Sequence, residues 1–244
     1  MCTLVVAFRH FTDRPLVVLA NRDERLDRPA APPTRWPGEP FVAPKDLAAG
    51  GTWLGFTDGG MFVGITNRFG VPKDDARKSR GDLVVHALRA PSARALHATL
   101  AGLDPLLYNA FHLLYVDQSD VFVTWCDGKV VHQATLGAGV NVVTERSLGG
   151  SDEGRTEAIL ARMGELGPSA DLESLEAIMR RHGDPPINGT CVHLPEFGYG
   201  TRSAMSLVVD DRGRPTMRFA DGNPCVTPYH DVALASGRGT VKGP

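Results

Sequence analysis

The order of short apolar segments constrains the fold more than any other feature of this sequence. Residues 4–8 and 16–20 flank a turn-rich link, and residues 53–56 and 62–66 flank Thr57-Asp58-Gly59-Gly60, so each pair is typical of a β-hairpin. Similar runs predict further strands at residues 111–116, 121–125, 140–143, 205–209 and 216–219. Strands are therefore expected at the beginning, in the middle and at the end of the chain.

Two pairs of segments with helical periodicity interrupt these strands. Ser79 is expected to cap a helix that carries Leu83, and Pro91 is expected to open a second helix. Another pair is expected to begin at Ser151 or Asp152. Groups of strands that alternate with helix pairs fit two packed sheets with helices on the outside.

The remaining segments bear on domain organisation. Residues 29–44 hold many prolines, which lack a backbone donor, so an irregular loop is expected there. No internal repeat or linker is apparent, and a single domain is predicted for residues 1–234. The small and basic residues at 235–244 predict a disordered tail.

The composition narrows the classes of function. The chain has 244 residues, 42% of them hydrophobic, and a formal net charge of −2. This charge offers no strong field to nucleic acid, so no nucleic-acid partner is expected. Four widely separated cysteines favour a reducing compartment over a disulfide framework. No apolar run reaches the length of a membrane span or a signal-peptide core, so a cytoplasmic protein without a transmembrane segment is expected.

Cys2 stands directly before the first predicted strand and has two interpretations. In the first, it is a packed residue of a buried strand. In the second, removal of Met1 makes it an N-terminal nucleophile, and its α-amine, with a pKa of about 7.7 to 8.0, acts as the base. Arg22 follows the second strand and would lower the pKa of the thiol, and Asp23 could hold the amine.

Two further polar clusters lie beside predicted strands. Asn141 could donate its amide to an oxyanion, and Arg202 stands shortly before the strand at residues 205–209. The eight histidines show no paired metal spacing. Cys191 and His193 stand close together without a partner that would complete a zinc site, so no metal site is expected.

Several spaced segments together resemble a known family. They are MCTLVVAF, LANRDE, GGTWLG, GITNRF, SRG and YGTRS. In this order they are similar to the NRDE family, also called the transport and Golgi organisation protein family, from residue 2 to about residue 209. That family resembles the N-terminal-nucleophile cysteine hydrolases of the penicillin V acylase and bile salt hydrolase type. The resemblance implies an α+β fold, a four-layer αββα sandwich.

The resemblance also implies a set of roles. Cys2 would be the nucleophile, and Arg22 and Asp23 would match the arginine and aspartate that flank it. Asn141 and Arg202 would match the oxyanion amide and a late arginine. The implied activity is that of a cysteine amidohydrolase or thioesterase that cleaves a linear carbon–nitrogen or thioester bond in a small molecule with an apolar part, without any cofactor.

The alternative is a protein that binds and traffics haem, acyl-coenzyme A or another lipid without catalysis. Haem is the candidate cofactor in that interpretation, and His193, His86 and Cys2 are all left open as its axial ligand. The sequence names no oligomeric state. Both interpretations use the same cleft, so the state of the Cys2 amine distinguishes them.

Overall fold

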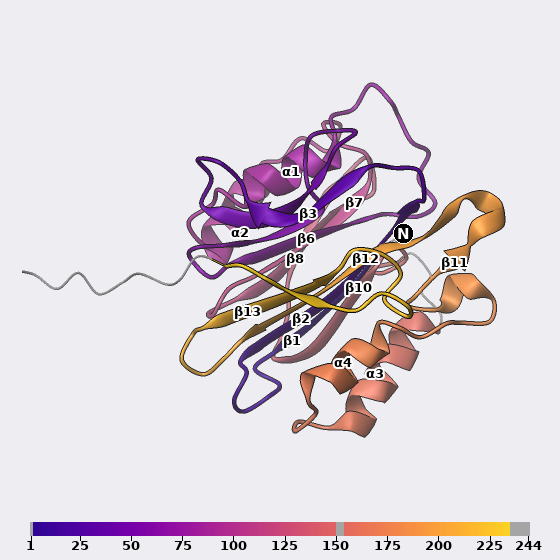
Figure 1. The fold of residues 1–244 in the computed structure, drawn as a ribbon. Helices are drawn as coiled ribbons and strands as arrows, with labels where there is room; N and C mark the ends of the chain where they lie inside the picture. Colours follow the sequence, from indigo (N-terminus) through magenta and orange to yellow (C-terminus); the bar gives the residue numbers. More distant parts are fainter. Residues whose placement is uncertain (1, 150–153, 235–244) are drawn as a thin grey trace, which may run out of the picture.

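Two seven-stranded β-sheets pack face to face, and a pair of α-helices lies on the outer side of each sheet (Figure 1). This arrangement is that of a computed structural model, which describes residues 2–149 and 154–234. The four layers confirm the predicted α+β fold of αββα type. The predicted tail at residues 235–244 lies outside the described residues.

The first sheet carries both ends of the described chain. Its strands are arranged β10-β1-β2-β12-β13-β14, with β11 paired to β12, and all pairings are antiparallel. The bounds are β1 (Cys2–Phe8), β2 (Leu16–Arg25), β10 (Gly139–Thr144), β11 (His193–Leu194), β12 (Tyr199–Val209), β13 (Pro215–Ala220) and β14 (His230–Val232). Because β1 lies between β10 and β2, the first described residues belong to the interior of the sheet.

The second sheet follows the chain in order from β3 to β9. Its strands are β3 (Ala30–Arg35), β4 (Phe41–Asp46), β5 (Leu54–Thr57), β6 (Phe62–Asn67), β7 (Phe111–Val116), β8 (Val121–Cys126) and β9 (Val131–Thr135). The irregular loop expected at residues 29–44 is wrong, because β3 and most of β4 lie there. β3 is an edge strand, and Pro32 and Pro33 fall where its register with β4 shifts, so no ladder donor is needed from them.

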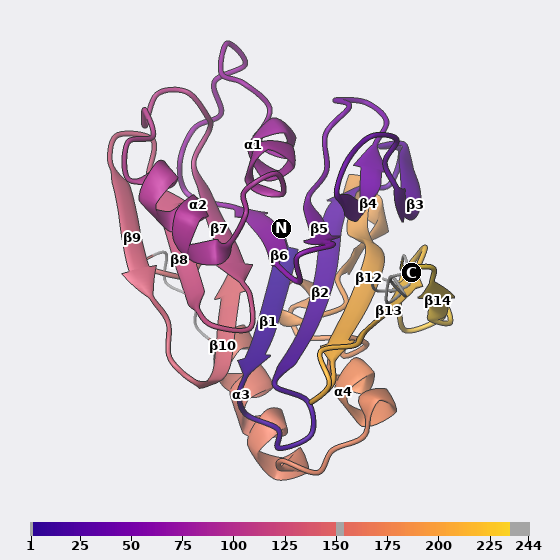
Figure 2. The same cartoon turned by 90° about the vertical axis from the view of Figure 1, so that its left-hand side faces the viewer.

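The helices form the two outer layers (Figure 2). α1 (Arg80–Ala87) and α2 (Ala93–Leu100) pack against the second sheet, and α3 (Arg155–Leu166) and α4 (Leu172–Ile178) against the first. Two short 3₁₀ helices, η1 (Pro186–Asn188) and η2 (Pro195–Phe197), lead into β12. Ser79 caps α1 as predicted, whereas Ser92 rather than Pro91 marks the start of α2. The predicted helix start at Ser151 or Asp152 lies outside the described residues.

Alternation along β1 and β2 decides which side chains meet in the site. Leu4 and Val6 face the space between the sheets, whereas Val5 and Ala7 face the helix layer formed by α3 and α4. Both faces are buried, which explains why these strands are continuous apolar runs. None of the helices in residues 2–149 and 154–234 is both long and apolar enough to cross a membrane.

Candidate active site

Cys2 and Arg22 are direct cross-strand neighbours. The register of the β1–β2 hairpin pairs Cys2 with Arg22 and Leu4 with Ala20. Side chains of directly opposed residues in an antiparallel pair lie on the same face, so the thiol and the guanidinium both belong to the face between the sheets. The predicted proximity of these two residues is therefore confirmed by the geometry.

A cavity of about 540 Å³ opens beside this pair. The ends of β1, β2 and β6, the loop before β5 and the start of α1 all contribute to its wall. Residues that line it include Cys2, Arg22, Asp46, Trp53, Asn67 and Arg80. The thiol thus lies at the mouth of the space between the two sheets, within reach of a small molecule.

Arg22 is held by charge and by an aromatic ring. Its Nη2 lies 3.3 Å from Asp46 Oδ2 and 3.6 Å from Glu24 Oε2. Its guanidinium carbon lies 4.1 Å from the centroid of the Trp53 ring, within the range of a cation–π contact. Only 4% of Arg22 is exposed. Since the side chain is fixed on two sides, the positive charge beside Cys2 has a defined position.

The electrostatics of Cys2 differ from the expectation. Burial raises the pKa of the thiol above its ordinary value. Arg22 and a hydrogen bond from the Asp23 backbone act in the opposite direction, but burial outweighs them. The prediction that Arg22 lowers the pKa holds for its own contribution and is wrong for the net direction.

Asp23 faces the helix layer rather than the space between the sheets. Its Oδ1 accepts a hydrogen bond of 2.6 Å from Thr201 Oγ1, its cross-strand partner on β12. Burial raises the pKa of the carboxyl to about 6, against the opposing effect of the Thr201 hydrogen bond. Asp23 is also among the residues that line the cavity.

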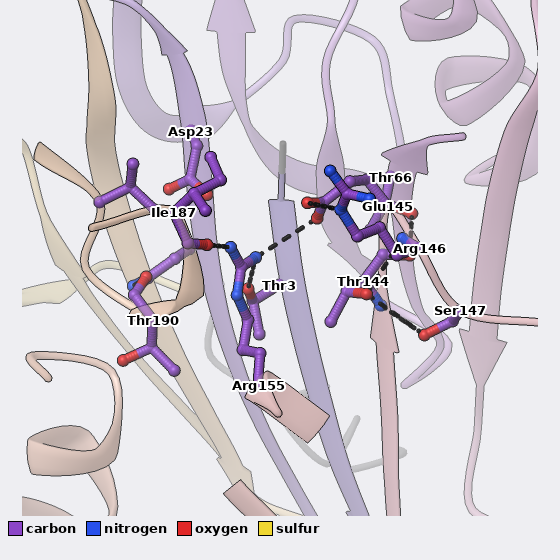
Figure 3. A network of polar contacts seen from close by, with 12 residues as sticks. Thr3, Asp23, Thr66, Thr144, Glu145, Arg146, Ser147, Arg155, Ile187 and Thr190 are labelled. Carbon is purple, nitrogen blue, oxygen red and sulfur yellow. Dashed lines mark hydrogen bonds and ion pairs between the residues drawn. The ribbon is translucent and has the colours of Figure 1, made fainter. Parts of the chain in front are cut away.

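A buried polar network supports the helix-facing side of the site (Figure 3). The Arg155 guanidinium, from the start of α3, donates to Thr3 Oγ1 at 3.2 Å and to Glu145 Oε2 at 3.3 Å. It also donates to the carbonyl of Ile187. The network joins the start of β1, the end of β10 and the η1 segment, and no sequence pattern predicted it.

Asn141 does not lie beside Cys2. In the β1–β10 register it is opposite Val6, four residues further along β1, which corresponds to about 13 Å. Its amide donates to the carbonyls of Gly137 and Gly139. Among the described residues that line the cavity Asn141 is absent. The expected position of Asn141 at the oxyanion is therefore corrected.

Arg202 lies near the site but beyond Arg22. It is the extra residue of a β-bulge, since Thr201 pairs with Asp23 and Ser203 pairs with Arg22. It shares a small pocket with Arg22 and Trp53. Its strand lies two spacings from β1, or about 10 Å. Arg202 therefore lies near Arg22 and not beside Cys2, so the expected grouping of Arg202 with Cys2 is corrected.

Arg80 is a second cation beside Cys2 that the site prediction missed. Burial lowers the pKa of its guanidinium, and the charge of the Cys2 thiolate acts in the opposite direction. Its Nη1 donates to the carbonyl of Ala110 at 2.9 Å. Ser79 caps the same helix, so the predicted cap already located Arg80 at a helix N-terminus. This place of Arg80 at the start of a capped helix was the sequence signal that could have identified it as a site residue.

Two glycines of the cavity wall allow a close backbone approach. A Cβ added to Gly51 would lie 2.6 Å from the carbonyl carbon of Gly81. A Cβ on Gly81 would lie 3.2 Å from the Cα of Gly51. The loop before β5 therefore touches the first turn of α1, and only residues without a side chain fit at this contact.

The expectation of no metal site rested on Cys191 and His193 having no partner, and that premise is wrong. From the sequence alone, no partner was expected for Cys191 and His193. In the structure, His182 and Cys225 lie beside them, and one ligand atom from each of the four residues lies within 4.8 Å of the others. This cluster lies away from the residues that line the cavity beside Cys2.

The sequence matches a family model described as "Transport and Golgi organisation 2" over residues 1–150. The Transport and Golgi organization protein 2 homolog of Homo sapiens is 28% identical over 127 residues, which cover 48% of this chain and 46% of that protein. The chain thus spans about half the length of the human relative and of its mouse counterpart. The Bos taurus homolog is 24% identical over 278 residues, which cover 96% of this chain and 100% of that protein.

Solved structures with a similar fold include an amidase ortholog and a bile acid hydrolase. The Caenorhabditis elegans N-acylethanolamine-hydrolyzing acid amidase ortholog has a TM-score of 0.54 at 14% identity, covering 85% of this chain and 92% of that one. A variant of the conjugated bile acid hydrolase from Clostridium perfringens has a TM-score of 0.54 at 9% identity, covering 96% and 97%. At such low identity the likeness shows the N-terminal-nucleophile hydrolase fold alone.

Proposed function

The chain belongs to the Transport and Golgi organisation 2 family, and from this premise and the geometry of the site we propose that it is a cysteine hydrolase. It would cleave a linear carbon–nitrogen or thioester bond with Cys2 as the nucleophile. The observation that carries the proposal is the pairing of Cys2 with a fixed Arg22 at the mouth of a cavity of about 540 Å³. The hydrolase fold of the similar structures supports it.

The proposed reaction has two stages. Removal of Met1 gives Cys2 a free α-amine, which accepts the thiol proton as the sulfur attacks the carbonyl carbon of the substrate. The tetrahedral intermediate expels an amine or a thiol, which takes that proton, and leaves an acyl group on sulfur. Water then attacks this thioester, releases the carboxylic acid and restores Cys2. Asn67, at the end of β6 on the cavity wall, replaces Asn141 as the candidate donor to the oxyanion.

The cavity favours a substrate with an anionic group. Lys78 and Arg80 line it, and within residues 2–149 and 154–234 neither forms an ion pair. The N-terminus of α1 lies at the same wall, where backbone N–H groups and the helix dipole favour negative charge. A phosphate or carboxylate of the substrate would therefore bind here.

A second cavity extends the site with apolar surface. It has a volume of about 520 Å³, and Phe69, Val71 and Pro72 form part of its wall. Asn67 and Arg80 line both cavities, so they adjoin. An amphipathic substrate such as an acyl thioester of coenzyme A matches both halves, with the acyl chain against Phe69 and the phosphates near Arg80.

The same two cavities support the alternative of a carrier without catalysis. An acyl-coenzyme A carrier would use the apolar and cationic halves in the same way. For haem, Cys2 lines the first cavity and is the remaining axial candidate, because His193 and His86 do not line it. The specific observation that favours a carrier is the raised pKa of the Cys2 thiol, which reduces the thiolate fraction at neutral pH.

Three forms of the untagged protein distinguish these functions. Intact mass first shows whether Met1 is removed. Cys2→Ala keeps the amine and deletes the sulfur, and an uncleavable N-terminal extension keeps the sulfur and acylates its amine. Hydrolysis of acyl-coenzyme A and N-acyl amine panels should fall by a factor on the order of 10³ or more in both forms. Cys126→Ala, at a buried cysteine of β8, is the matched control and should retain turnover.

Ligand binding tests the carrier separately. At a free ligand concentration 100-fold above the dissociation constant, binding would stabilise the fold by about 2.7 kcal/mol. Thermal unfolding with haemin and with a long-chain acyl-coenzyme A measures this gain. Stabilisation together with no turnover in any form would replace the hydrolase proposal by the carrier.

A further inference from the structure

Four potential metal ligands converge away from the Cys2 cavity. Cys191 Sγ and Cys225 Sγ each lie 3.3 Å from His193 Nε2. The His182 ring stacks on the His193 ring, with 4.8 Å between centroids. One ligand atom of each residue lies within 4.8 Å of all the others. The set of two thiols and two imidazoles is one that zinc sites use.

The spacing of these atoms is close to that of a tetrahedral site. With metal–sulfur bonds of about 2.3 Å and metal–nitrogen bonds of about 2.0 to 2.1 Å, a tetrahedron has edges of roughly 3.3 to 3.8 Å. The two sulfur–nitrogen contacts of 3.3 Å and the limit of 4.8 Å for the whole set need only small side-chain shifts to reach it. Cys191 and His193 are two residues apart just before and at the start of β11, and the 3.3 Å contact shows that their side chains turn toward each other.

The backbone around the ligands is held in place independently of any metal. The Cys191 amide donates to the carbonyl of Arg181, next to His182, at 2.9 Å. Gly183 and Gly189 approach so closely that a Cβ on either would lie within 2.5 Å of backbone nitrogen of the other. This contact returns the chain from His182 to Cys191. The ligands therefore start from a prearranged loop.

The Cys225 turn is fastened to the same region by Asn223. Its Nδ2 donates to the carbonyl of Thr201 at 2.8 Å, and its own carbonyl accepts from the amide of Thr227 at 2.9 Å. Thr201 Oγ1 accepts from the amide of Val192 at 2.8 Å and donates to Asp23. Thr201 thus connects the ligand loop, residues 182–193, to the Cys225 turn and to β2, the strand that carries Arg22.

We propose that His182, Cys191, His193 and Cys225 form a zinc-class metal site. The metal would hold the ligand loop and the Cys225 turn together next to Thr201, the hydrogen-bond partner of Asp23. Four protein ligands close the coordination sphere of a tetrahedral ion, which is the arrangement of structural rather than catalytic zinc. The site stabilises the fold and is independent of the hydrolase proposal. Its ligands come from three separate segments, so the metal would join the chain after α4 to the segment before β14.

Metal content tests the proposal directly. The full-length reduced protein is stripped with a chelator, loaded with zinc, dialysed and analysed for bound metal. About one zinc per chain is expected, and the cobalt(II)-loaded protein should show the intense visible absorption of a tetrahedral thiolate site. Cys225→Ser should lose this stoichiometric binding. Cys126→Ser changes a cysteine of β8 and should keep it.

A second variant guards against misfolding as the cause. His182 is exposed, so His182→Gln should fold and yet bind zinc at least about tenfold more weakly. Chelator should lower the thermal midpoint of the unsubstituted protein and leave that of Cys225→Ser unchanged. Zinc binding that is equal in the unsubstituted protein, Cys225→Ser and His182→Gln overturns the proposal. A Cys191–Cys225 disulfide that persists after treatment with reductant and zinc also overturns it.

Discussion

The two faces of β2 place the polar residues of a single four-residue segment in two different environments. Arg22 and Glu24 face the cavity, where they form partly solvated ion pairs with Asp46 and Arg28. Asn21 and Asp23 face the helix layer, where they are buried and bonded to fixed groups of other segments. The segment Asn-Arg-Asp-Glu is thus two interleaved pairs, because successive residues of a strand point to opposite faces.

The two faces therefore have different roles: the helix-facing residues hold the fold together, and the cavity-facing residues act on the Cys2 thiol. Asn21 Nδ2 donates to the carbonyls of Met179 and Thr190, at 2.8 and 2.7 Å, and so ties α4 and the ligand loop to the sheet. Arg22 instead pairs with carboxylates of the cavity wall and places a positive charge beside the Cys2 thiol. We infer that substitutions on the helix-facing side change stability, whereas those on the cavity side change reactivity.

Asn21→Ala should have the largest effect on this comparison. Two buried carbonyls lose their donor, and each costs about 1 to 3 kcal/mol, so the free energy of unfolding should fall by about 4 kcal/mol. Urea unfolding of the purified variant measures it. Glu24→Gln, on the cavity side of the same strand, is the matched control and should change stability by less than about 0.5 kcal/mol. Equal losses in both variants would remove the distinction between the faces.

Carboxylates on the two sides of β2 should also make contributions to the free energy of unfolding that change with pH in opposite directions. The pKa of Asp23 is about 6 in the folded protein against an ordinary value of 3.8. Its protonated form is therefore favoured by folding, and this contribution is present below about pH 4 and lost as the pH rises through about 6. A shift of about two units corresponds to about 3 kcal/mol. Asp23→Asn should remove that part of the pH dependence between pH 4 and 7.

Asp46, on the cavity side, supplies the opposite case. Burial acts to raise the pKa of its carboxyl, but the hydrogen bond from Arg28 and a backbone amide outweigh it and lower the pKa. Its contribution to stability is present above the unfolded pKa and is lost as the pH falls through the lower folded value. Asp46→Asn should therefore flatten the acid side of the curve. A change of the same sign in both variants would contradict the assignment.

Arg22→Gln should alter reactivity more than stability. Without the guanidinium the pKa of the Cys2 thiol rises further, and one unit reduces the thiolate fraction, and with it the rate of alkylation at pH 7.5, about tenfold. Iodoacetamide labelling followed by peptide mass spectrometry measures the rate at each cysteine. Cys225 is the internal reference, and its rate should stay unchanged. An unchanged rate at Cys2 would show that Arg22 does not act on the thiol.

Local patterns predicted the parts of the molecule that local sequence determines. The apolar runs became β1, β2, β7 and β8, and the hairpin register brought Cys2 opposite Arg22, as adjacent strands must. Proline counts misled at β3 because a sheet edge with a bulge needs no donor from Pro32 or Pro33. β9 was missed because its half-exposed, polar residues lack an apolar run.

Non-local contacts account for what the sequence did not predict about the site. Which residue of β10 faces Cys2 depends on the register with β1, and that register is set by distant packing. The metal-ligand cluster depends on a loop contact at Gly183 and Gly189 and on the turn at Asn223, so Cys191 and His193 appeared unpartnered. Arg80 depends on a helix from the other sheet layer that reaches the cavity.

The smallest expected effect comes from Asn141, and it tests the corrected register of β10. Asn141→Ala removes an amide that donates to Gly137 and Gly139 at a half-exposed position, so stability should change by less than about 0.5 kcal/mol. Because the residue is opposite Val6, turnover should change less than about twofold, whereas loss of an oxyanion donor costs about 10² to 10³-fold. Asn67→Ala is the paired variant and should show that larger loss. If the two results were exchanged, β10 would have to be shifted along β1 by four residues, so that Asn141 lay opposite Cys2 instead of Val6. Asn141 would then regain the role that the sequence suggested.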